Sequence, residues 1–170
     1  MSAAAQGFPT HLAAELTGVT PRTLLNWCTR DFLKPSVSPG RTGPGGERMY
    51  SFRDLVAIRV ADDLRSRGID VRYLHSAVDY IRNREGLELD CVLPADTFLL
   101  SDGRTFREVQ FGPTFGERVL GAMQFAPSGP YSMLFIPFSK FVLEIQTKAR
   151  ACSLSAAVAP RPYPADEERR

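Results

Sequence analysis

Three polar side chains recur four residues apart near the start of this 170-residue sequence, at Arg22, Asn26 and Arg30. Residues four apart share one face of a helix, so these three would form a single polar stripe. Arginine can donate two hydrogen bonds to one guanine, and asparagine can bond one adenine at two points. Arginine also binds phosphate with the same forked geometry. The spacing therefore predicts contact with the bases and backbone of a nucleic acid.

The surrounding residues predict two short helices that would position this stripe. Apolar residues at Leu12 and Leu16 indicate a first helix, which a tight turn at Gly18 would end. A second helix follows, with Thr20 as its N-cap and Pro21 at its first position, where a missing N–H costs nothing. Two short helices joined by such a turn form a helix-turn-helix, whose second helix usually enters the DNA major groove.

Three further features follow the second helix in order. Two short strands are expected at residues 35–38 and 47–50, around a tip at 39–46 that is rich in glycine and proline. Ser51 and Asp54 predict a capping box for a helix that ends at Gly68. A fourth helix is expected from Asp70, with apolar residues on one face.

In this order the segments resemble the N-terminal winged helix-turn-helix domain of MerR-family transcription regulators. That family has a wing that closes on R-x-Y-x-x-x-D-L, here RMYSFRDL at 48–55, and a helical pair split by L-R-x-x-G, here LRSRG at 64–68. The match covers a little under half of the chain. Two positions depart from the pattern: Leu25 stands where the family has a DNA-facing arginine, and Asp31 where a glycine ends the second helix.

The resemblance and the residue chemistry together supply nine candidate DNA contacts. They are Thr20, Arg22, Thr23, Asn26 and Arg30 on the second helix, Arg41 at the wing tip, Arg48 and Tyr50 at the wing exit, and Arg53 at the next helix start. Structural alternatives are a solvated helix face for the polar stripe, a surface charge for Arg48 and a core position for Tyr50. Trp27 is expected in the core.

The second half of the chain changes to a period of two from Leu87. Strands are expected at 90–93, 97–100 and 105–109, with a hairpin turn at Asp102-Gly103, and another strand at 133–136. A final helix would carry Phe138, Phe141, Val142, Ile145 and Ala149 at helical spacing. The fold class is α+β: a winged helix-turn-helix domain at 1–86, a small β-hairpin-plus-helix module at 87–152, and a disordered tail at 153–170. In pattern the module resembles that of some bacterial regulators and of VapB-type antitoxins.

Composition and motifs further limit the functional classes to which the protein could belong. Residues 1–84 carry a net charge of +4 and residues 85–170 a net charge of −2, so the positive excess lies on the expected DNA-binding half. The sequence has no apolar run of membrane-spanning length and no signal-peptide pattern. Three widely spaced cysteines argue against a disulfide framework or a zinc site. No catalytic or phosphate-loop motif appears. We expect a cytoplasmic, nucleoid-associated protein that is not an enzyme and needs no metal or cofactor.

The expected partner is double-stranded DNA, bound by a homodimer that pairs through the C-terminal half. Two alternatives remain at this point. The C-terminal half could instead grip a different protein, as in an antitoxin or adaptor, or the chain could be a phage-type excision or recombination factor.

Overall fold

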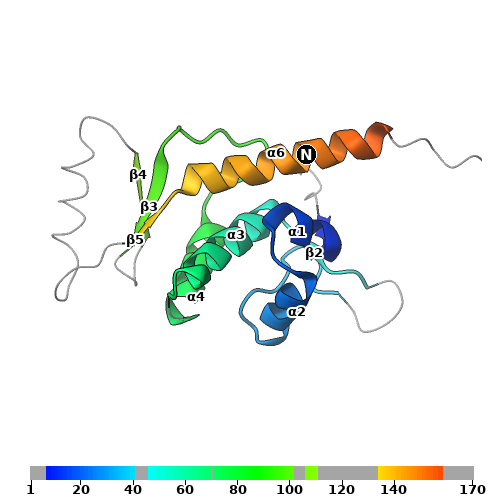
Figure 1. The fold of residues 1–170 in the computed structure, drawn as a ribbon, viewed down its shortest axis with the longest axis horizontal. Coiled ribbons are helices and arrows are strands. Elements are labelled where there is room, and N and C mark those ends of the chain that lie inside the picture. Colours follow the sequence, from blue (N-terminus) through cyan, green and yellow to red (C-terminus); the bar gives the residue numbers. More distant parts are fainter. Residues whose placement is uncertain (1–6, 41–45, 70, 102–105, 111–133, 159–170) are drawn as a thin grey trace, which may run out of the picture.

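The structure is a computed structural model that describes residues 7–40, 46–69, 71–101, 106–110 and 134–158 (Figure 1). Within these residues the helices are α1 (Thr10–Thr17), α2 (Pro21–Thr29), α3 (Phe52–Ser66), α4 (Val71–Asn83) and α6 (Phe138–Val158). The strands are β1 (Phe8–Pro9), β2 (Met49–Tyr50), β3 (Thr97–Ser101), β4 (Phe106–Gln110) and β5 (Leu134–Ile136). The α+β class predicted from the sequence is confirmed.

The helix-turn-helix forms from the local signals that predict it. Gly18 ends α1 in the left-handed conformation, with φ 76°, and its N–H donates to the carbonyl of Ala14 at 2.9 Å. Thr20 caps α2, since its hydroxyl accepts a hydrogen bond from the backbone N–H of Thr23 at 3.2 Å. Pro21 occupies the first helical position. These three residues set the angle at which α2 leaves α1.

The end of α2 uses an aspartate in the conformation that usually selects glycine. Asp31 has φ 58°, in the left-handed region. Aspartate enters this region more readily than most residues because its short polar side chain can bond locally. Its carboxylate lies 2.7 Å from the Nζ of Lys34. The departure from the family pattern at Asp31 therefore preserves the backbone turn.

The wing is built differently from the expected pair of strands. Residues 35–38 contribute only a single bridge, between Ser38 and Met49. The strand partner of β2 is instead β1, with Phe8 opposite Tyr50, a pairing that the sequence analysis missed. Gly40, with φ 76°, lies so close to the returning chain that an added Cβ would stand 2.8 Å from the Cγ of Arg48. The tip residues 41–45 lie outside the described part of the chain.

The predicted capping box at the start of α3 is confirmed. The backbone N–H of Asp54 donates to the Ser51 hydroxyl at 3.2 Å, and that of Ser51 donates to the Asp54 carboxylate at 2.9 Å. α3 ends before Gly68, as expected. α4 begins at Val71 and buries Leu74, Val78 and Ile81.

The C-terminal half contains a three-stranded antiparallel sheet in the order β4-β3-β5. The predicted hairpin of β3 and β4 is confirmed, although its turn at 102–105 is not among the described residues. The predicted strand at 90–93 is wrong. Cys91 donates its N–H to the carbonyl of Glu88, and its carbonyl accepts from the side chain of Gln146, so no strand partner is engaged.

Helix α6 joins the two halves of the chain into one core. It contacts α3, α1 and β3, and the apolar residues Phe138, Phe141, Val142, Ile145 and Ala149 that predicted it are all buried. Figure 1 shows α6 along one side of the molecule, with α2 on the opposite side. The helix continues to Val158, so the expected disordered tail is wrong for residues 153–158; residues 159–170 are not described. The division at 86 and 87 stays a prediction, and the buried core extends across it.

Candidate nucleic-acid interface

Helix α2 presents the predicted polar stripe to solvent. Arg22, Asn26 and Arg30 are all exposed, while Leu24 is the buried residue of the helix. Trp27 packs against the core, with its ring edge-to-face with that of Phe32 at a centroid distance of 5.2 Å. The apolar side of α2 is therefore anchored, and its polar side is open for contact with another molecule.

The side chains of Thr20 and Thr23 stabilise the start of α2 through hydrogen bonds. Their hydroxyl oxygens lie 2.9 Å apart, within hydrogen-bond distance, and the Thr20 hydroxyl also accepts from the Thr23 backbone. Thr20 is exposed and Thr23 is half-buried. Both residues lie at the start of α2, so a molecule bound to that end of the helix would be near them. Contact of either residue with DNA stays a prediction.

Of the two wing-exit residues, Arg48 remains a candidate DNA contact and Tyr50 does not. Arg48 is half-buried beside Gly40 at the exit of the wing. Tyr50 is fully buried in the core, so the prediction that it contacts DNA is wrong. Burial also raises the pKa of the Tyr50 hydroxyl, which keeps it uncharged. Arg41 lies outside the described residues, and its role stays a prediction.

Arg53 has an internal role that the sequence did not predict. Its Nη2 lies 2.7 Å from the Oε1 of Glu88, its Nε donates to the carbonyl of Leu87 at 3.2 Å, and its Nη1 donates to the carbonyl of Arg82 at 3.3 Å. The last carbonyls of a helix have no partner within it, so α4 needs donors at this end. Each of the three guanidinium nitrogens thus uses one N–H inside the protein, the side chain is one-third exposed, and the phosphate contact stays a prediction.

A buried carboxylate that the sequence analysis assigned only to capping organises the base of the wing. The Asp54 Oδ2 accepts hydrogen bonds from the Ser36 N–H at 2.8 Å and the Ser36 hydroxyl at 2.6 Å. Its Oδ1 accepts from the Nη2 of Arg82 at 2.6 Å and from its Nε at 2.8 Å. Arg82 also donates to the carbonyl of Lys34. The segment that leads from α2 into the wing is therefore tied to both α3 and α4.

A second polar cluster connects α6 to the helix-turn-helix. The Nζ of Lys148 donates to the carbonyl of Leu16 at 3.3 Å, in the last turn of α1. Glu144 lies 2.8 Å from Lys148 and 3.5 Å from the Nε of Arg59 on α3. The Arg59 guanidinium also stacks over the ring of Phe141, 4.5 Å from its centroid. These contacts hold α1 in a defined position on the C-terminal half.

The same cluster alters the acidity of its carboxylate. Burial of Glu144 opposes its ionisation, but the hydrogen bond from Lys148 and the charge of Arg59 together outweigh that effect. The pKa of Glu144 is consequently held below its usual value of 4.5.

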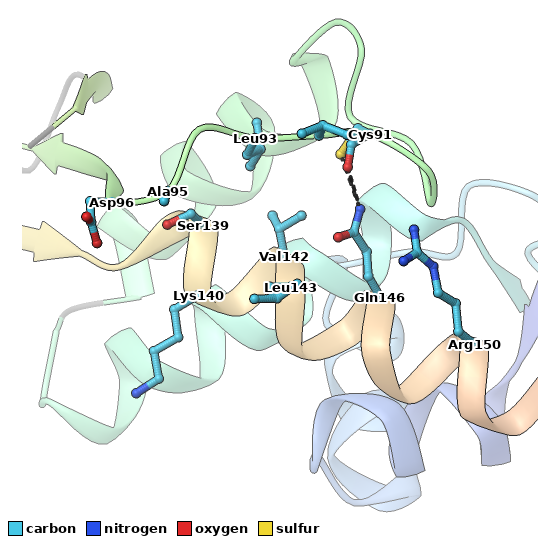
Figure 2. Close-up of a pocket in the computed structure, with 11 residues that line it drawn as sticks. Cys91, Leu93, Ala95, Asp96, Ser139, Lys140, Val142, Leu143, Gln146 and Arg150 are labelled. Atoms are coloured by element: carbon cyan, nitrogen blue, oxygen red, sulfur yellow. Dashed lines mark hydrogen bonds between the residues drawn. The ribbon is translucent and has the colours of Figure 1, made fainter.

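The outer face of α6 carries a groove of about 490 Å³, bounded by residues 91–96 (Figure 2). Gln146 crosses its floor and donates to the carbonyl of Cys91 at 2.7 Å. Asp96 lies at one end of the groove and Arg150 at the other, whereas Lys140 points away from it. Two of its apolar residues are unusually exposed, Val92 at 93% and Leu143 at 61%.

The described residues contain no cluster of histidine, cysteine or carboxylate side chains that could hold a metal ion. Their cysteines, Cys28, Cys91 and Cys152, are free thiols. Among the helices in the described ranges, none is both long enough and apolar enough to cross a membrane.

Comparison with known proteins agrees with this architecture. Residues 9–80, from the end of β1 into α4, match the family described as MerR HTH family regulatory protein. The chain is also 31% identical over 112 residues to uncharacterized HTH-type transcriptional regulators of Mycobacterium tuberculosis and Mycobacterium bovis. That alignment covers 66% of this chain and 45% of each relative, so the chain spans under half the length of these curated relatives. Residues 9–80 therefore form a helix-turn-helix domain similar to that of the MerR family of regulatory proteins.

Proposed function

We propose that this protein is a sequence-specific double-stranded DNA-binding transcriptional regulator that acts without catalysis. The observation that carries the proposal is the exposed stripe of Arg22, Asn26 and Arg30 on a helix whose opposite face is anchored in the core. The helix-turn-helix geometry presents such a helix to the major groove. The relatives bear the name of transcriptional regulators, which supports the same assignment. Such a protein would work in the cytoplasm, associated with the nucleoid.

The proposed division of labour follows the positions of the side chains. Arg22 and Asn26, on α2, would contact base edges, where arginine pairs with guanine and asparagine with adenine. Arg30 and the threonines at the helix start would contact the backbone. Arg48, at the wing exit, would contact phosphate, which adds affinity without sequence preference.

The proposal includes a homodimer, because one short recognition helix covers only one half-site. The groove on the outer face of α6 is the best candidate surface. A two-fold symmetric interface must be complementary to itself. The pairing is supported by an acid (Asp96) at one end of the groove, a base (Arg150) at the other and exposed Leu143 between them. An antiparallel second copy would bring each acid to the base of its neighbour. Since α2 lies on the opposite side of the molecule from α6, pairing would leave both recognition helices free (Figure 1).

The DNA-binding proposal is tested by selection of duplexes from a random pool with the full chain. We expect one enriched motif with two related half-sites, bound at least about 1,000-fold more tightly than scrambled DNA. Equal affinity for all duplexes would contradict the proposal.

The homodimer is tested separately by light scattering on the full chain. We expect twice the monomer mass at about 10 μM or above, a range where moderate dimers assemble. Leu143→Glu should give the monomer mass, whereas Val37→Glu, which adds the same charge on the wing side, should not. A wild-type chain that stays monomeric would exclude the homodimer. That result would favour the alternative in which the C-terminal half binds a different protein.

A further inference from the structure

Leu25 is an exposed leucine in the middle of the recognition helix. Its side chain is 44% exposed, although the neighbouring Leu24 is fully buried. Arg22, three residues before it, and Asn26, immediately after it, are both exposed. Isolated apolar residues are common on protein surfaces. The position of Leu25 is unusual because it lies among the polar groups proposed to contact base edges.

Leu25 is the exposed large apolar side chain of α2. Thr29, one turn later, donates its hydroxyl to the carbonyl of Leu25 at 2.9 Å, so that hydroxyl is engaged within the helix. The Thr20 and Thr23 hydroxyls lie within hydrogen-bond distance of each other at the helix start. Leu25 itself can neither bond a phosphate nor accept from a base. Any favourable contact that it makes in the groove must therefore come from burial of apolar surface.

The major groove offers one common apolar group, the C5-methyl of thymine. An amino or carbonyl group of another base placed against leucine would lose its water without a new hydrogen bond, which is unfavourable. Arg22 and Asn26 are about 6 Å apart along the helix axis, at about 1.5 Å per residue. Successive base pairs are about 3.4 Å apart, so a base contacted by Leu25 would lie within one or two steps of the bases contacted by those two residues.

We infer that Leu25 is a specificity-determining residue that selects thymine in each half-site through its C5-methyl group. This inference rests on the proposed function, because it requires α2 to enter the major groove. It adds a base preference that hydrogen bonding by Arg22 and Asn26 would not produce.

The experiment uses the full chain and the duplex selected above, with each thymine replaced in turn by uracil. This replacement removes one methyl group and leaves base pairing and every hydrogen-bonding group unchanged. At one thymine in each half-site we expect binding to weaken about fourfold, the value for burial of a single methylene-sized group. In Leu25→Ala, binding to the thymine duplex should fall, and the additional loss caused by uracil should disappear.

Tyr73→Ala is the matched control, because it removes an exposed large side chain on α4, outside both α2 and the groove on α6. Its affinity for both duplexes should change together, with the fourfold ratio retained. Circular dichroism should show both variants folded, since each substitution is at an exposed helical position. The inference is overturned if no thymine responds to uracil, or if Leu25→Ala keeps the fourfold ratio. Failure to select any sequence would instead overturn the proposed function, and this inference with it.

Discussion

Arg82, near the end of α4, forms an ion pair with Asp54, in the first turn of α3, at 2.6 Å. The Asp54 side chain is fully buried and the Arg82 side chain is about one-quarter exposed. The other oxygen of Asp54 holds Ser36, at the base of the wing. One carboxylate therefore connects α3, α4 and the segment that leads from the recognition helix into the wing.

Asp54→Asn should destabilise the protein strongly. The substitution leaves Arg82 without a counter-charge and Ser36 with a weaker acceptor, and loss of one partner of a buried pair costs about 3 kcal/mol or more. Urea unfolding measures the change in the free energy of unfolding. Asp62→Asn, which removes the partner of the exposed Arg65, is the control and should cost less than about 1 kcal/mol. Similar values for the two variants would contradict a structural role for the buried pair.

Replacement of Arg48 by alanine should affect DNA binding, whereas replacement of Arg53 should affect the stability of the fold. Arg48→Ala should weaken binding to all duplexes alike and lower the slope of log K against log salt by about one unit for each subunit. Arg53→Ala should instead lower the free energy of unfolding by about 1–3 kcal/mol, because it removes charge-assisted hydrogen bonds to the end of α4. Its salt slope should match that of the wild type. A reduced slope for Arg53→Ala would show that Arg53 contacts phosphate as well as the end of α4.

Arg22→Ala and Asn26→Ala should each reduce specific binding by about 1–3 kcal/mol, since each would remove a two-point contact with a base. Binding to a scrambled duplex should change much less. Isotherms on both duplexes provide the measurement, and Glu15→Gln, at an exposed position of α1, is the control. If Arg22→Ala lowers affinity equally on the two duplexes, Arg22 contacts the backbone only.

Stability should fall in acid partly because of Glu144. Its pKa is lower in the folded protein than the usual 4.5, so its ionised form stabilises the fold. This contribution is fully present above the unfolded pKa and is lost as the pH falls through the folded pKa. Thermal unfolding between pH 7 and pH 3 should show a smaller loss for Glu144→Gln than for the wild type. The exposed Glu15→Gln should follow the wild-type curve, and identical curves for all three proteins would refute the prediction.

The sequence by itself determined the elements whose signals are local. Thr20, Pro21 and Gly18 specify the ends of α1 and α2 because a cap, a proline or a left-handed glycine acts within one turn of chain. The spacing of Phe138, Phe141 and Ile145 specifies α6 in the same way, since it places these side chains on one face.

Only the tertiary structure decided which polar residues face solvent. Tyr50 and Arg53 belong to a segment with the family's wing pattern, yet one is in the core and the other bonds the end of α4. Asp54 meets Arg82 across 28 positions, and Lys148 meets Leu16 across 132. Such pairs produce no periodic pattern in the sequence, because helix packing brings together residues that are far apart along the chain. The strand predicted at 90–93 failed for the same reason: its alternation was real, but Gln146 of α6 took the carbonyl that a neighbouring strand would have used.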